Sequence, residues 1–151
     1  MGAAHPTGAV IRRNLAGALA DRAHYDEAGR LLREVLERLR DAYGTSHNDV
    51  ATTLHELGQL ARRRGDLVEA ESRFSEALAM RRELLGAQHY LTARSLAALG
   101  EARLVGSDPA SARQPLEDAV VVLRRTLPAD HPVVVSATRD LERARQIRTG
   151  R

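Results

Sequence analysis

Apolar residues recur along the chain at spacings of three and four, in stretches separated by turn signals. Within residues 47–88 the first stretch places on one helix face Leu54, Leu57, Gly58 and Ala61. The second stretch does the same with Ala70, Phe74, Ala77 and Leu78. This spacing predicts two amphipathic helices, and Arg64-Gly65-Asp66 between them predicts a turn. Residues 47–88 are therefore expected to form a helical hairpin, whose first and second helices we name A and B.

The hairpin pattern recurs with a period of 42 residues. Two columns at this period, which need no gap, are His5, His47, His89 and His131, and Leu15, Leu57, Leu99 and Leu141. Repetition at a fixed period of this size is typical of stacked supersecondary units. The predicted units are residues 5–46, 47–88 and 89–130. Residues 131–147 form a lone A helix with an apolar stripe, Val134, Ala137, Leu141 and Ala144, and this helix is expected to cap the array.

Small and special residues predict details of each hairpin. Gly58 and Ala70 remove bulk where the two helices of the second unit approach. In the third unit, Asp108 before Pro109 predicts an N-cap followed by a proline at the first helical position. A second proline six residues later, Pro115, predicts a bend or a late start of that B helix. The B helices are expected to end at Gly44, Gly86 and Pro128.

Composition supports an all-α single domain. The 151 residues are 43% hydrophobic with one Phe, three Tyr and no Trp, so the core must be built from aliphatic residues that favour helices. No cysteine is present, which excludes a disulfide, a thiolate nucleophile and a cysteine zinc site. No lysine is present either, which excludes the phosphate-loop, Schiff-base and kinase lysines.

Charge and hydropathy bear on location and partners. The N-terminal residues lack the features of a signal peptide, and no apolar run reaches the length of a membrane span, so a cytoplasmic protein without membrane contact is expected. The pI of 10.1 accompanies a net charge of only +3, because arginine does not titrate near neutrality. The basic excess lies in the last segment rather than in a continuous stripe, so nucleic acid is not the expected ligand.

Candidate chemistry is sparse. The four histidines of the 42-residue column suggest a metal site, but equivalent positions in successive hairpins lie about 10 Å apart, too far to share one ion. Each is expected instead to close a turn or begin a helix, and His24 is expected to be a turn residue. No Gly-x-Ser-x-Gly motif and no glycine-rich phosphate loop occurs. Arg62-Arg63-Arg64 suits the helix dipole at the end of an A helix. We therefore expect neither catalysis nor a cofactor.

The repeat resembles the tetratricopeptide repeat family, in the 42-residue variety of kinesin light chains and many bacterial multidomain proteins. The resemblance rests on Leu57-Gly58 in helix A and on Ala70, Phe74 and Ala77 in helix B. The linkers also fit, since this variety runs Leu-Gly-x-x-His-Pro into the next unit and the chain has Leu85-Gly86-Ala87-Gln88-His89. Arg12 and Arg103 depart from the pattern at positions that are usually large and apolar, which implies looser first and third hairpins.

What the resemblance implies is a right-handed superhelical array of antiparallel hairpins, whose A helices line a concave groove that binds a peptide or partner protein. Asn14 matches an asparagine that relatives use against the peptide backbone, whereas Glu56, Ala98 and Asp140 replace it in the other units. The residues mapped onto the groove are Arg13, Asn14, His55, Gln59, Arg62, Arg94, Glu101, Arg139 and Arg143.

The sequence therefore favours a non-catalytic protein-interaction scaffold. The arginines among the groove residues favour an acidic peptide or a free C-terminal carboxylate, because guanidinium groups match carboxylate geometry. The alternatives are a homo-oligomerisation element in which exposed ends of the array stack on a second copy, and a regulatory segment of a larger bacterial signalling protein, such as a kinase or nucleotide-switch ATPase. A weak nucleic-acid function is a further alternative.

Overall fold

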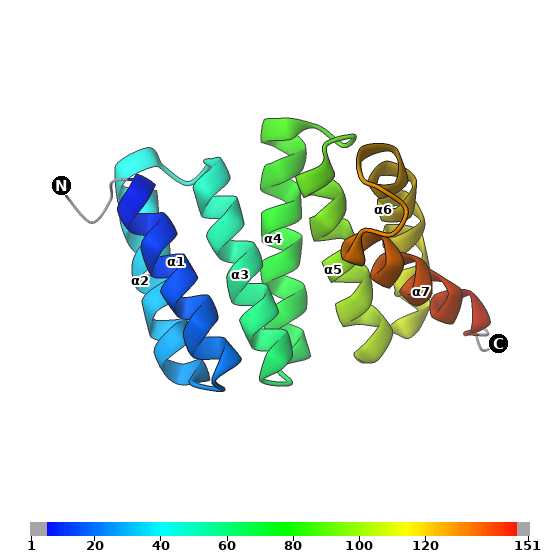
Figure 1. The fold of residues 1–151 in the computed structure, drawn as a ribbon, viewed down its shortest axis with the longest axis horizontal. Helices are drawn as coiled ribbons and strands as arrows, with labels where there is room; N and C mark the ends of the chain where they lie inside the picture. Colours follow the sequence, from blue (N-terminus) through cyan, green and yellow to red (C-terminus); the bar gives the residue numbers. More distant parts are fainter. Residues whose placement is uncertain (1–5, 148–151) are drawn as a thin grey trace. The chain divides into compact units, whose positions relative to one another are not determined.

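The computed structural model describes residues 6–147, and within them the chain is helical with no strand (Figure 1). The helices are α1 (Pro6–Asp21), α2 (Tyr25–Tyr43), α3 (Asn48–Arg63), α4 (Leu67–Leu85), α5 (Tyr90–Val105), the 3-10 helix η1 (Pro109–Ala112), α6 (Arg113–Thr126) and α7 (Pro132–Gln146). The prediction of an all-α fold is confirmed.

Two compact units divide the chain, Met1–Met80 and Arg81–Arg151, and the division falls within α4. In the first unit α1 and α2 form an antiparallel hairpin and α3 packs on α2 (Figure 1). In the second unit α5 packs against η1 and α6, while α7 packs on α6 and also contacts α5. The boundaries of the 42-residue repeats stay a prediction.

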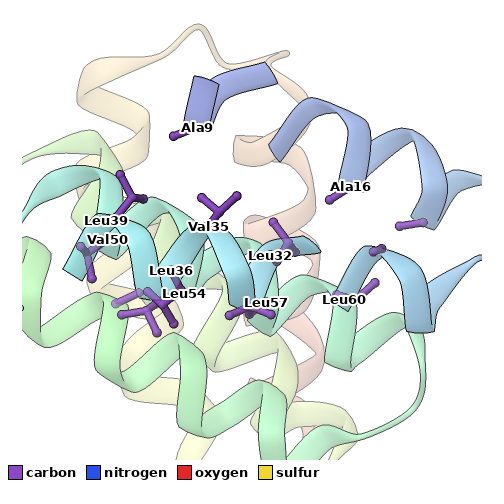
Figure 2. Close-up of a cluster of buried hydrophobic side chains, with 13 residues drawn as sticks. Ala9, Ala16, Leu32, Val35, Leu36, Leu39, Val50, Leu54, Leu57 and Leu60 are labelled. Atoms are coloured by element: carbon purple, nitrogen blue, oxygen red, sulfur yellow. The ribbon is translucent and has the colours of Figure 1, made fainter. Parts of the chain in front are cut away.

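The core of the first unit is aliphatic, as the composition requires. Its buried side chains come from α1, α2, α3 and, with Ala77, α4. Those labelled in Figure 2 come from the first three helices and are Ala9, Ala16, Leu32, Val35, Leu36, Leu39, Val50, Leu54, Leu57 and Leu60. Alanines on α1 face larger residues on α2, so the two helices approach closely. The predicted face of α3 is buried, because Leu54, Leu57 and Ala61 are each at most 5% exposed.

Glycine permits the close approach of A and B helices in both units. A Cβ atom on Gly58 would lie 2.6 Å from the Phe74 ring, and one on Gly100 would lie 2.5 Å from Leu116 Cγ. No real Cβ contact is that short, so any larger residue would force the facing side chain to move. The predicted role of Gly58 is confirmed, and its large neighbour is Phe74.

The histidine column caps the A helices. The Nδ1 atom of His47 accepts a hydrogen bond from the Asp49 backbone N–H (3.1 Å), and that of His89 accepts one from the Leu91 N–H (3.1 Å). His131 Nδ1 accepts from the Val133 N–H in the same way (3.3 Å). Each imidazole satisfies a backbone donor that the first helical turn leaves unpaired. The prediction that these histidines begin helices is confirmed for these three; His5 lies outside the described residues.

The start of the third B helix differs from the prediction. The Asp108 side chain makes no capping hydrogen bond, and Pro109 opens the 3-10 helix η1 rather than an α-helix. The α-helix begins only at Arg113, which places Pro115 in its first turn. A proline is tolerated there because the first-turn N–H groups have no partner within the helix. Asp108 and Pro109 therefore hold the predicted N-cap and first helical positions, but of a 3-10 helix and without a side-chain cap, and the late start predicted from Pro115 is confirmed.

The two ends of the repeat pattern differ in burial. The stripe of α7 is buried as predicted, since Val134, Ala137, Leu141 and Ala144 are each at most 5% exposed. Leu15 does not follow its column: it is 52% exposed, whereas Leu57 and Leu141 are 3% and 5% exposed. The difference arises because α3 packs on α2 and α7 packs on α6, while no described helix covers the corresponding face of α1.

Candidate functional site

A hollow of about 430 Å³ lies between α1 and α3 in the first unit. The polar residues lining it are Arg13, Asn14 and Asp21 from α1, and Glu56, Gln59 and Arg63 from α3. These residues line the hollow because α1 and α3 are both A helices. Within each helix the lining residues are spaced mainly by three, four or seven positions, which places them on one face. The lining includes three of the predicted groove residues, Arg13, Asn14 and Gln59.

Arg13 lies at one end of this hollow and is neutralised by carboxylates. Its Nη1 lies 3.5 Å from Asp49 Oδ1 and its Nε lies 3.5 Å from Glu56 Oε2, and its side chain is only 9% exposed. Burial strengthens such charge pairs, because water screens them less. Arg13 therefore ties α1 to α3 and adds little net positive charge to the hollow. Asp49 was missed at the sequence level, because its 36-residue separation from Arg13 falls outside the 42-residue columns.

A second ion pair joins α1 and α3 at the other end of the hollow. Arg63 Nη1 donates to Asp21 Oδ1 at 2.9 Å. These two residues are separated by 42 positions, so they occupy the same column of adjacent A helices. The middle of the hollow, between the two ion pairs, carries the Asn14 and Gln59 amides and Gly17. An amide can both donate and accept a hydrogen bond, as a peptide backbone does.

His55 supports this wall from beneath. The side chain is buried, at 4% exposure, and its ring centroid lies 5.2 Å from that of Phe74. Its Nε2 lies 3.2 Å from Gln59 Nε2, within hydrogen-bonding distance. The structure therefore places His55 behind Gln59, and the exposed Gln59 stands on the surface. Arg62 is half-buried in the last turn of α3.

The predicted residues of the second unit lie on α5 and α7. On α5, Arg94 places its guanidinium 5.9 Å from the Tyr90 ring centroid, and Glu101 is half-buried. On α7, Arg139 is exposed and lines a hollow of about 550 Å³ together with Glu142 and Arg124. Arg143 Nη1 lies 3.6 Å from Asp140 Oδ1. Arg139 is thus exposed beside a hollow, whereas the charge of Arg143 is partly compensated.

The described residues offer no cluster suited to metal chemistry. Nowhere in residues 6–147 do three or more His, Asp or Glu side chains converge as a metal-binding group. Among the described helices, none combines the length and the apolar character that crossing a membrane requires.

Comparison with known proteins identifies the family. The model described as "Tetratricopeptide repeat" matches residues 9–83 and again residues 49–125. The chain belongs to the tetratricopeptide repeat family. Members of this family generally act as protein-protein interaction scaffolds. No curated protein sequence matches the chain.

Solved structures of tetratricopeptide repeat proteins have the same fold. The TPR-like repeats of a candidate kinesin light chain from Podosopora anserina match with a TM-score of 0.75 and 24% identity, over 97% of this chain and 69% of that one. BtubC (BKLC) from P. vanneervenii matches with a TM-score of 0.73 and 20% identity, over 91% of this chain and 59% of that one. The predicted resemblance to kinesin-light-chain-like repeats is confirmed.

Proposed function

We propose that this tetratricopeptide repeat chain is a non-catalytic scaffold that holds an extended peptide in the hollow between α1 and α3. The observation that carries the proposal is the pair of amides, Asn14 and Gln59, on facing walls of that hollow. Two amides on opposite walls suit the alternating N–H and C=O groups of an extended backbone. A volume of about 430 Å³ suits a few residues of peptide rather than a folded domain.

The ion pairs at the ends of the hollow support recognition of the backbone rather than of ligand charge. Arg13 is paired with Asp49 and Glu56, and Arg63 is paired with Asp21. Breaking such pairs to bind a charged ligand would leave a carboxylate without its partner. An acidic peptide or a free C-terminal carboxylate is proposed instead as a ligand of the second unit by itself, where the guanidinium groups of Arg94 and Arg139 supply the donors.

Two pairs of substitutions test the proposal on labelled peptide arrays containing acidic and basic sequences, each with free and with amidated C-termini. Asn14→Ala with Gln59→Ala should weaken all peptides about tenfold or more, because both backbone contacts are lost. Arg94→Glu with Arg139→Glu should remove the preference for acidic peptides, and binding of acidic peptides to the unaltered chain should fall as salt rises.

The control is Arg30→Glu with Arg33→Glu, which makes the same change of charge on exposed positions of α2. It should retain both binding and preference. Unchanged binding by the Asn14 and Gln59 double variant would overturn the assignment to this hollow. Loss of binding in the α2 control alone would place the ligand on the B helices instead.

A further inference from the structure

A hollow of about 250 Å³ in the second unit lies between the end of α4, the loop that follows it, and the helices α5 and α6. Two of its lining residues, Leu96 and Val122, are aliphatic and at most 5% exposed. Two others are charged, namely Arg82 of α4 and Asp118 of α6. The hollow therefore combines a buried aliphatic surface with a cation and an anion carried by different helices.

The first unit joins the same two repeat columns by an ion pair. One repeat before Arg82 and Asp118 stand Arg40 and Glu76. There Arg40 Nη2 donates to Glu76 Oε1 at 2.7 Å. Within the described part of the chain, the Arg82 side chain makes no ion pair or hydrogen bond, and Asp118 Oδ1 accepts instead from Gln114 Nε2 at 2.9 Å. Aspartate is one methylene shorter than glutamate, so the second unit leaves this cation and anion apart.

A second difference between the repeats enlarges the gap. Met80 packs against the core of the first unit, and the same column in the second unit holds Val122. Methionine has a long unbranched side chain, whereas valine ends at its γ carbons. The shorter Asp118 and Val122 therefore leave open, in the second unit, the space that a glutamate and a methionine occupy in the first.

Three polar groups at this hollow have bonding capacity that the protein leaves unused. The Arg82 guanidinium supplies a fork of donors. Gln88 Oε1 accepts from Arg125 Nη1 at 3.3 Å, which leaves the Gln88 amide N–H groups to donate. The second carboxylate oxygen of Asp118 can accept from a cation. Donors for a carboxylate and an acceptor for an ammonium group thus line the same hollow as the aliphatic side chains.

We propose that this hollow binds a free α-amino acid with an unbranched aliphatic side chain, such as methionine. The ligand carboxylate accepts from Arg82 and Gln88, and its ammonium group donates to Asp118. Its side chain packs on Leu96 and Val122. A residue inside a peptide carries neither terminal charge, so it would leave both protein charges unpaired.

So small a ligand in an open hollow binds with a dissociation constant on the order of 1 mM. The site shares no lining residue with the hollow between α1 and α3. The inference therefore stands or falls independently of the proposed peptide binding.

Titration of L-methionine into the isotope-labelled chain, followed by NMR, tests the proposal. The side-chain amide of Gln88 and the backbone amide of Val122 should shift with a single dissociation constant. Arg82→Gln should raise that constant at least tenfold, because the carboxylate loses its charged donor. Arg124→Gln is the matched control, since Arg124 is also exposed, occupies the same repeat column and does not line this hollow. The control should bind methionine like the unaltered chain.

Refilling the hollow gives an independent test. Asp118→Glu with Val122→Met restores the residues of the first unit, so this double variant should lose methionine binding. Its melting temperature should be retained or raised, because the longer carboxylate can pair with Arg82 as Glu76 pairs with Arg40. A folded double variant that still binds methionine would overturn the proposal, as would binding that Arg82→Gln leaves unchanged.

Derivatives of methionine show which ligand groups are recognised. Norleucine should bind like methionine, whereas methionine amide and N-acetylmethionine each lack one charge and should bind at least tenfold more weakly. Equal binding of N-acetylmethionine would indicate recognition of the C-terminal residue of a peptide, and equal binding of methionine amide that of an N-terminal residue. Either result, or the absence of any shift at methionine concentrations well above the expected dissociation constant, would overturn the proposal.

Discussion

Gly58 shows how one missing side chain determines the distance between two helices. A methyl group at this position would lie 2.6 Å from Phe74 Cε1 and 2.7 Å from Cδ1, and the ring is fully buried. A buried ring has little room to move. A side chain at position 58 would therefore disturb the packing of the two helices as a whole and not only its contact with the ring.

Gly58→Ala should lower the free energy of unfolding by about 1–3 kcal/mol, because the overpacked Phe74 ring must shift. The control is Gly17→Ala, also inside an A helix, where no atom lies within 4 Å of the added carbon. Alanine favours a helix over glycine, so this control should stabilise the chain by about 0.5–1 kcal/mol. Urea unfolding measures both, and equal shifts in the same direction would contradict the steric account.

Ala23 occupies a backbone conformation that suits glycine. Its φ is 61°, and one repeat later the same position in the turn is Gly65, with φ of 83°. An L-residue in this left-handed region is strained by its Cβ atom, whereas glycine is not. The first hairpin therefore carries strain that the second avoids.

Exchanging the two residues tests this strain directly. Ala23→Gly should stabilise the chain by about 0.5–1 kcal/mol, and Gly65→Ala should destabilise it by about 1 kcal/mol. A Cβ at Gly65 meets no atom within 4 Å, so any loss there reports backbone conformation rather than a clash. Thermal melts of both variants measure the difference, and a destabilised Ala23→Gly would rule out strain at that turn.

At the scale of the element, α7 stabilises the second unit by covering α6. Its buried stripe faces a helix whose Val120 and Leu123 are themselves at most 5% exposed. An ion pair joins the same helices, since Arg145 Nη2 of α7 lies 3.6 Å from Glu117 Oε1 of α6. The hydrogen bond from Arg113 lowers the pKa of the Glu117 carboxyl, and the Arg145 charge adds to this effect. That contribution is present above the ordinary glutamate pKa and is lost as pH falls through the lowered value.

Truncation after Asp130 should lower the free energy of unfolding by about 3–6 kcal/mol, since burial of a Val or Leu side chain contributes about 1.5–3 kcal/mol and α7 buries both Val134 and Leu141. The uncovered face of α6 should also promote aggregation. Urea unfolding and light scattering measure the two effects. The control ends after Ile147 and keeps all of α7. A chain ending at Asp130 that matched this control would show that α7 is not a cap.

At the scale of the whole molecule, periodicity predicted the fold because each 42-residue unit repeats the same pattern of apolar helix faces, which pack against neighbouring helices in the same way. The buried stripe of α7 occupies the same columns as buried residues of α3, and the histidine caps follow their column as well. Leu15 does not, because a column describes which face is apolar and not whether a neighbour covers it. The 3-10 geometry of η1 was not predicted either, since Asp108 and Pro109 are equally compatible with the start of an α-helix and with a 3-10 helix.

The candidate site was less predictable than the fold for a related reason. Helix periodicity placed Arg13 and Gln59 on the faces of α1 and α3 that line the hollow, but the partners of Arg13 come from another helix, 36 and 43 residues away. Only the packing of α1 against α3 shows that this arginine is neutralised. Much of the formal positive charge is compensated in this way, as in Arg40 with Glu76 (2.7 Å) and Arg64 with Asp26 (3.4 Å). The high pI thus overstates the basic surface.

The exposed side of α7 is largely polar, and this limits where the chain can gain further repeats. Duplication of a 42-residue segment before α7 reproduces the glycine at the close approach and the capping histidine in the right register, so the inserted hairpin arrives with its contacts already encoded. A hairpin appended after α7 would find Thr138, Glu142 and Arg145 where α3 has Leu54, Gly58 and Ala61. A duplicated 42-residue segment is therefore accommodated more readily before α7 than after it.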